Sequence, residues 1–392
     1  MGPVFSAALV GVLFGSLMFS MLADRIGRRP VLIAVTLYFS ALTFMTARVD
    51  TVNQLLIVRF LGGLGLGGIM PNAMALVGEY SPARSRVTAM MVTSNGFTLG
   101  AAFGGPIAAW LIPNYGWRGV FYFGAATPLV IALLMFFLLP ESLQFLALRG
   151  HNKNQIARWL KRVDPSLTVG PETEYVIPEE KKRGVPMIQL FHDGRALGTA
   201  LLWVVNFMNL LNLYFLSNWL PLVVSSAGYS NSIAVNSASV LQAGGVLGTL
   251  VLSSFVYRFG FTTVLTMSFA LACVSIAAIG QPYLSLAMLF IAVFLAGFGI
   301  PGSQAGLNAL AATYYPTDLR STGVGSGLGI GRIGSIVGPF VGGILLSRHW
   351  TAHDLFLAAA IPAFISAVVM FFLRWVIKPA ATVAAATEAL VH

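Results

Sequence analysis

Long apolar runs recur along the whole chain, and they limit its possible folds more than any other feature. A transmembrane helix needs about 20 mostly apolar residues. Eleven runs approach or exceed this length, at roughly 4–22, 31–47, 54–78, 87–112, 119–139, 196–225, 233–257, 261–280, 284–312, 322–346 and 353–377. The strands of a membrane barrel are shorter, about 10 residues, and alternate strictly. The runs therefore predict an all-α integral membrane protein.

The composition excludes several other classes. Of 392 residues, 57% are hydrophobic and 9% are charged, against about 25% charged in a soluble domain. A secreted protein and a nucleic-acid-binding protein are therefore excluded. The single cysteine, Cys273, rules out an internal disulfide. The net charge of +10 fits a membrane protein whose Lys and Arg residues gather in cytoplasmic loops.

The basic residues also predict the orientation. If Arg25, Arg28 and Arg29 lie in the cytoplasm, alternation of the spans places most other Lys and Arg residues there too. The outer side then receives Arg48, Arg118 and Arg348. We therefore expect an external N-terminus, a cytoplasmic C-terminus and a location in the bacterial inner membrane.

Polar composition divides the chain into four parts. Residues 1–140 hold five predicted spans, and residues 196–378 hold six. Between them, 141–195 is rich in charge and proline, which predicts a cytoplasmic loop. Residues 379–392 form a predicted cytoplasmic tail.

The two span-bearing parts resemble one another in sequence. Pro82, Arg86 and Thr88 match residues 316, 320 and 322, and glycines 100 and 104 match glycines 334 and 338, at a constant offset. We infer a tandem duplication in which 196–225 has no first-half counterpart. The expectation is a parent of twelve helices whose first helix is absent here; a genuine eleven-helix protein is the alternative.

The segment Gly15-Ser-Leu-Met-Phe-Ser-Met-Leu-Ala-Asp24-Arg25-Ile-Gly27-Arg28-Arg29 is the most specific motif. It resembles the loop signature of the major facilitator superfamily, in which this loop latches the two halves in one state of the transport cycle. A plain basic anchor at the membrane surface is the alternative reading. We group Glu79, Arg86 and Arg320, at predicted cytoplasmic helix ends, with this motif as gating residues.

Further runs narrow the resemblance. They are the stretch from Arg59 to Asn72, the stretch from Gly96 to Pro106, Pro140-Glu141-Ser142, and the stretch from Gly302 to Pro339. Together they are similar to the aromatic acid:proton symporter family over nearly the whole chain. The resemblance implies a bundle of two pseudo-symmetric halves that moves small carboxylates with protons. That family carries acidic residues in its first helix, and no position here receives them.

Polar side chains within the predicted spans are the candidate substrate contacts. Arg332 lies near the middle of its span, where a carboxylate would find a planar two-pronged partner; a structural arginine at a helix break is the alternative. Arg59 lies nearer the outer surface, where it can snorkel. The resemblance to the superfamily implies instead a pairing with an acid of the first helix, a partner that we expect to be missing here. The amides that complete the set are Asn206, Asn209, Asn212, Gln242, Gln304 and Asn308. They either tie helices together or bind a hydroxylated ring.

These observations favour a secondary transporter that takes up small aromatic or organic acids with protons by alternating access. A sugar porter or a drug/proton antiporter of the same superfamily, and an inactive fragment of a transporter, are the alternatives. A membrane enzyme or sensor is disfavoured because the outer loops lack catalytic groupings. We expect no cofactor, no metal, no catalytic residue and no nucleic-acid partner. The expected partners are a carboxylate substrate, protons and the lipid bilayer, for a monomer.

Overall fold

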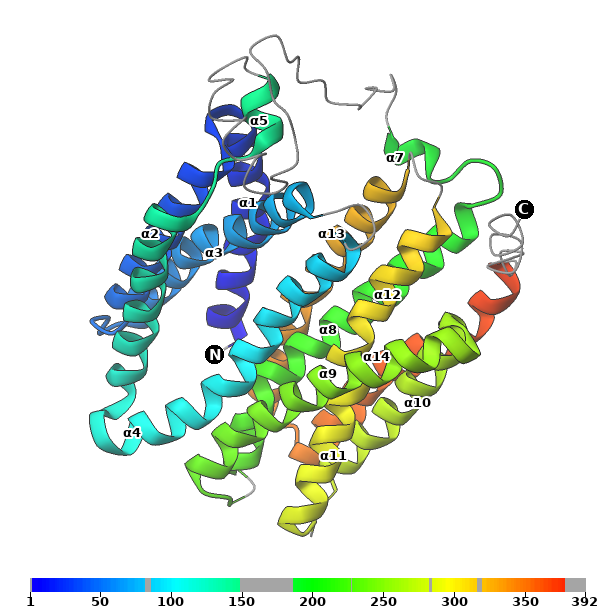
Figure 1. Ribbon diagram of the computed structural model, residues 1–392. Helices are drawn as coiled ribbons and strands as arrows, with labels where there is room; N and C mark the ends of the chain where they lie inside the picture. Colours follow the sequence, from blue (N-terminus) through cyan, green and yellow to red (C-terminus); the bar gives the residue numbers. More distant parts are fainter. Residues whose placement is uncertain are drawn as a thin grey trace. The chain divides into compact units, whose positions relative to one another are not determined.

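A computed structural model describes residues 2–81, 86–148, 186–226, 228–281, 284–315 and 319–377. All regular elements in these ranges are helices (Figure 1). The first-half helices are α1 (Gly2–Ile26), α2 (Arg28–Thr46), α3 (Val52–Tyr80), α4 (Arg86–Leu138) and the short α5 (Leu143–Leu148). The remainder are α7 (Pro186–Gln189), α8 (Ala196–Ser226), α9 (Asn231–Phe259), α10 (Phe261–Ile279), α11 (Leu286–Gly299), α12 (Pro301–Tyr314), α13 (Arg320–Ser347) and α14 (Ala352–Val376).

The predicted spans reappear as helices, with one difference in how they are joined. Ten stretches of the described chain are long and apolar enough to cross a membrane. The predicted spans 87–112 and 119–139 form the single helix α4, whose 53 residues would extend about 80 Å across a hydrocarbon layer of about 30 Å. Gly116, with φ 69° and ψ 176°, breaks α4 between them. Counting α4 as two spans restores the predicted eleven.

The predicted span 284–312 is divided in a different way. It consists of α11 and α12, which meet at Ile300. Pro301 opens α12, and since proline has no N–H to donate, it is well placed at the first position of a helix.

By its contacts the chain forms two compact units, one of Ala7–Phe97 with Trp110–Arg183, the other of Gly184–His392 with Met1–Ser6 and Thr98–Ala109. The second unit holds the larger apolar core, in which Trp219, Phe269 and Phe356 are almost fully buried. The predicted linker 141–195 is described only at its ends, by α5, α7 and their neighbours. The predicted tail 379–392 lies outside the described residues.

One close glycine contact between helices recurs in both units. A Cβ built on Gly11 of α1 would collide with the carbonyl oxygen of Phe60 in α3. At the duplicated positions, a Cβ on Gly244 of α9 would collide with the carbonyl oxygen of Phe294 in α11. The α1–α3 and α9–α11 pairs are thus held backbone against backbone, which only glycine permits. The recurrence at equivalent positions fits the inferred duplication.

The turns that follow α1 and α9 also match. Gly27 and Gly260 have φ values of 105° and 79°, a region that favours glycine. Each lets one long helix end and the next begin within a single residue.

One pair of duplicated glycines differs in its surroundings. Gly334 and Gly338 of α13 lie against the carbonyl oxygens of Phe207 and Leu211 in α8. Their first-half equivalents are Gly100 and Gly104 of α4. No atom of the described residues comes within 4 Å of a Cβ built on either of these. The glycine face that receives α8 in the second half therefore has no described helix against it in the first.

Candidate substrate site and gating network

Four of the predicted amide side chains form one hydrogen-bonded cluster between α8 and α12, which we call the amide cluster. Asn209 donates from Nδ2 to Oε1 of Gln304 over 2.8 Å. Gln304 donates from Nε2 to Oδ1 of Asn206 at 3.3 Å and to Oδ1 of Asn308 at 3.2 Å. Asn206 and Asn209 on α8 thus meet Gln304 and Asn308, which lie four residues apart on α12.

Gln304 is the centre of this cluster. Its carbonyl oxygen accepts one bond and both hydrogens of its NH₂ group are donated, so little of its capacity remains for a ligand. Asn209 is fully buried, yet its Oδ1 has no partner among the described residues. An unpaired buried acceptor of this kind is costly. The cluster therefore holds an acceptor that a donor group could satisfy.

Two predicted amides stand apart from the amide cluster. Asn212 is 1% exposed, and neither its Nδ2 nor its Oδ1 has a partner in the described part of the chain. Gln242 on α9 is buried, and no hydrogen bond to the four clustered amides is found for it within the described ranges. The repeat of three residues on α8 placed Asn206, Asn209 and Asn212 on neighbouring faces, but the structure joins only the first two to Gln304.

Arg332 lies near the middle of α13 and is partly buried. Its Nη1 donates to the hydroxyl oxygen of Tyr214 on α8 over 3.4 Å, a long contact that leaves most of its five donors available. The preceding residue, Gly331, is packed against the backbone oxygen of Asn206, 3.1 Å from a Cβ built there. The residue before Arg332 thus lies against the α8 backbone at Asn206, a member of the amide cluster, while the Arg332 side chain reaches Tyr214.

The base of α8 is also fixed to α12. The hydroxyl of the buried Tyr315 donates to Oγ1 of Thr199 over 3.2 Å. Burial raises the pKa of Tyr315, although the hydrogen bond to Thr199 and the charge of Arg195 act in the opposite direction. The phenol therefore stays protonated and serves as a donor. Tyr314 adds a bond from its hydroxyl to the carbonyl oxygen of Arg195 at 3.1 Å.

Arg59 belongs to the other unit. Its guanidinium lies over the ring of Phe121 in the second part of α4, 5.4 Å from the ring centre. Its Nε is buried and unpaired among the described residues. A cation–π contact of this kind stabilises the charge within the first half.

The turn between α1 and α2 carries a network of charged groups. Arg28 forms an ion pair with Glu79 at the end of α3, with 3.0 Å between Nη1 and Oε1; the pair is close, but it lacks the alignment of a hydrogen bond. Glu79 in turn accepts from the hydroxyl of Ser142 through Oε2 over 2.6 Å. Two of the predicted gating residues, Arg28 and Glu79, are thus brought together.

Glu141 is the residue that sequence reasoning left out of this network. Its Oε1 accepts from the backbone N–H groups of Arg28 at 2.9 Å, Arg29 at 3.2 Å and Ser142 at 2.8 Å. The first two open α2, where N–H groups lack helical partners and a negative charge is favoured. The hydroxyl of Tyr80 donates to the backbone oxygen of Glu141 over 2.7 Å. The signal was present in Pro140-Glu141-Ser142, directly after a span.

The other gating residues lie as follows. Asp24 is exposed and makes no hydrogen bond or ion pair with the described residues, so Glu141, and not Asp24, holds the start of α2. Arg29 donates from Nη2 to the carbonyl oxygen of Phe136 over 2.6 Å. Arg25 is exposed. The side chains of Arg86 and Arg320 lie outside the described set.

Comparison with known proteins places the chain in a family. A family model described as Major Facilitator Superfamily matches residues 1–255 and 202–391. The chain is 38% identical over 376 residues to the 4-hydroxybenzoate transporter PcaK of Acinetobacter baylyi, covering 95% of this chain and 82% of that protein. It is 37% identical over 367 residues to a gallate transporter of Pseudomonas putida, covering 93% and 81%.

A solved structure agrees in fold. The xylose transporter XylE of E. coli, in a partially occluded inward open conformation, superposes with a TM-score of 0.72 at 14% sequence identity, covering 96% of this chain and 87% of that one. The chain therefore belongs to the Major Facilitator Superfamily and resembles its aromatic acid transporters. It is a multi-pass membrane transporter and not an enzyme.

Proposed function

We propose that the chain takes up small aromatic or other organic acids together with protons, by alternating access. The observation that carries the proposal is Arg332, a partly buried cation with available donors in the middle of α13, a helix that contacts α8 at Asn206 of the amide cluster. A charged side chain within a membrane span is energetically costly and usually has a function. A substrate carboxylate that accepts two hydrogen bonds from the guanidinium would offset this cost.

The two parts of the proposed site suit the two ends of such a molecule. Arg332 binds the carboxylate, and Tyr214 holds the guanidinium in place. The amide cluster meets the far edge of the ring, where a hydroxyl could donate to the unpaired Oδ1 of Asn209. The relatives named for 4-hydroxybenzoate and gallate, both hydroxylated aromatic acids, support this substrate class.

The network around Arg28, Glu79 and Glu141 is the proposed gating element. It joins the starts or ends of α2, α3 and α5 through charges, and such charges are easily exchanged for others during a conformational change. Asp24, which is exposed and unpaired with the described residues, is proposed to make its contacts in another state of the cycle. We place this network on the cytoplasmic side of the bacterial inner membrane, with the C-terminus on the same side.

Uptake of labelled 4-hydroxybenzoate and benzoate into cells tests the proposal. We expect the substrate to accumulate and an uncoupler to abolish the accumulation. Uptake that is unchanged by the uncoupler would contradict proton coupling. Arg332→Lys keeps the charge but loses the planar fork, so it should weaken acid uptake more than Arg59→Lys, a matched change in the other unit.

Competition separates the remaining candidates. The amide cluster alone would also suit a neutral polyhydroxylated substrate, but Arg332 favours an anion. Unlabelled aromatic acids should compete with the labelled substrate, whereas sugars and cationic dyes should not. Competition by xylose and not by benzoate would favour a sugar porter.

A further inference from the structure

Two exposed arginines lie over aromatic rings near the ends of α9 and α14, within one compact unit. The guanidinium carbon of Arg374 is 4.5 Å from the ring centre of Phe371 and 4.2 Å from that of Trp375. The guanidinium carbon of Arg258 is 5.5 Å from the ring centre of Phe259. We call these five residues the arginine–aromatic patch.

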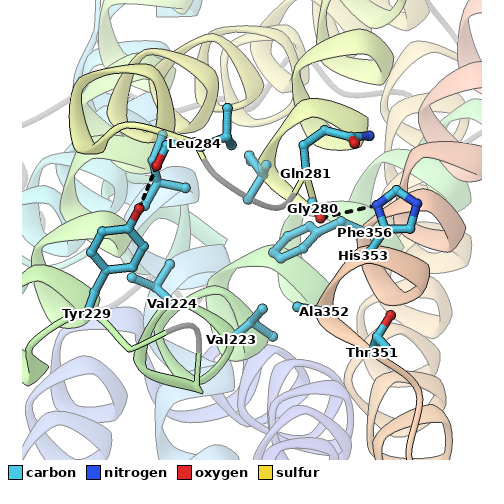
Figure 2. A pocket seen from close by; sticks show the side chains of 12 residues that line it. Val223, Val224, Tyr229, Gly280, Gln281, Leu284, Thr351, Ala352, His353 and Phe356 are labelled. Atoms are coloured by element: carbon cyan, nitrogen blue, oxygen red, sulfur yellow. Dashed lines mark hydrogen bonds between the residues drawn. The ribbon is translucent and has the colours of Figure 1, made fainter.

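The two arginines lie at the same end of a helix pair, because α10 and α14 pack against each other in opposite directions. Where α10 ends and α14 begins, Nδ1 of His353 lies 3.2 Å from the carbonyl oxygen of Gly280, as Figure 2 shows. From this contact, α10 runs back to Phe261 and α14 runs on to Arg374, each over about 30 Å. Arg258 precedes Phe261 by three residues, so both cations reach the far end of the pair (Figure 1).

No acidic side chain of these helices balances the two charges. Neither Arg258 nor Arg374 has a hydrogen bond or an ion pair with the described residues. The sequences of α9 and α10 contain no Asp or Glu. The single acid of α14, Asp354, lies in its first turn, about 30 Å from Arg374. This end of the three helices is therefore positively charged and attracts anions.

Apolar side chains continue from the patch along the outer surface of the same helices. Ile361, Phe364 and Phe372 of α14 are all more than half exposed, and so are Met267 and Val274 of α10. In a membrane-spanning bundle, such an exposed apolar surface lies against acyl chains. A lipid whose chains follow this surface would bring its phosphate to the level of the two arginines.

We propose that the arginine–aromatic patch binds an anionic phospholipid through its phosphate. A guanidinium that lies over a ring uses its flat face for that contact, which leaves the N–H groups at its edge for phosphate oxygens. The aromatic rings suit the headgroup level of a bilayer. In the orientation proposed above this is the cytoplasmic leaflet, whose surface is negatively charged. The lipid site does not depend on the transported substrate.

Native mass spectrometry of the purified full chain in detergent tests the proposal with three matched probes. Dioleoyl phosphatidylglycerol has a net negative charge, dioleoyl phosphatidylcholine has the same chains without net charge, and glycerol 3-phosphate has the anion without chains. We expect the phosphatidylglycerol complex to have a dissociation constant about five-fold lower, or less, than the phosphatidylcholine complex. Equal affinity for the two lipids would overturn the proposal. Displacement of phosphatidylglycerol by equimolar glycerol 3-phosphate would also overturn it, because a soluble anion would then be the ligand.

Variants of the patch locate the binding. Arg258→Gln combined with Arg374→Gln removes both charges, so the preference for phosphatidylglycerol should fall to about one; Arg374→Gln alone should lower it part of the way. Phe371→Leu combined with Trp375→Leu keeps the charges but removes the rings beneath Arg374, and should lower the preference about two-fold or more. Arg348→Gln, just before α14 begins, should leave the preference unchanged. An undiminished preference in the double glutamine variant, with an unchanged melting temperature, would place the lipid elsewhere.

Discussion

The carboxylate of Glu141 accepts a hydrogen bond from the backbone N–H of Arg28 over 2.9 Å, although the two residues are 113 positions apart. A side chain that follows the last span of the first half thus caps the first turn of α2. Replacing Glu141 by Ala leaves the N–H groups of Arg28 and Arg29 without this acceptor, and we expect a loss of roughly 1–2 kcal/mol. Glu141→Gln keeps an acceptor and should lose less. Thermal unfolding in detergent measures both, and equal melting temperatures would contradict the capping role.

The duplicated turn glycines provide an internally matched pair. Gly27→Ala and Gly260→Ala both place a side chain at positive φ, at a cost of about 1 kcal/mol or more. In addition, a Cβ at Gly27 would collide with the Glu141 carboxylate, whereas one at Gly260 meets no described atom within 4 Å. We therefore expect Gly27→Ala to be the more damaging in both melting temperature and uptake. The reverse order would mean that the contact with Glu141 is unimportant.

Replacement of Gln304 should reduce uptake more than replacement of the amides around it. Its replacement by Ala removes three side-chain hydrogen bonds, whereas Asn308→Ala removes one of them. We expect uptake to fall at least several-fold further in the first variant. A double-mutant cycle with Asn209→Ala should show that the two effects are not additive, because the residues share a bond. Strict additivity would show that each acts alone.

Asp24→Asn tests the gating proposal apart from stability. The side chain is exposed and forms no hydrogen bond or ion pair with the described residues, so the melting temperature should stay within the small range typical of surface substitutions. Uptake should nevertheless slow, because the proposed contact belongs to another conformation. Unchanged uptake by the correctly inserted variant would leave Asp24 without a role in gating.

The glycine faces of α13 and α4 should differ in their tolerance of larger residues. A side chain at Gly334 would meet the backbone of α8, so Gly334→Leu should prevent normal folding of the second half. At the duplicated position, a Cβ built on Gly104 meets no described atom of another helix within 4 Å, so Gly104→Leu should be tolerated. Protease resistance of the two variants in membranes compares them directly. Equal damage at both positions would show that a helix packs against α4 as well.

Sequence patterns predicted the features that depend on one helix at a time. Apolar runs located the spans, and the four-residue spacing placed Gln304 and Asn308 on a common face, where a bond now joins them. Features that need a second helix were missed or misassigned. Asn212 belongs to the same stripe as Asn209, but it does not reach Gln304, because the neighbour of each face is set by tertiary packing. Glu141 was overlooked for the same reason, since its partner lies at the start of α2.

The repeated backbone contact between α1 and α3 and between α9 and α11 has an evolutionary consequence. Because the spacing of these helices is set by glycine against main chain, it does not depend on the side chains of their other faces. At positions equivalent to Gln304 and Asn308, the first half has Met70 and Met74. Each copy could therefore change these side chains after the inferred duplication without altering how its helices pack. The second half has hydrogen-bonding amides at these positions, and the first half has apolar methionines.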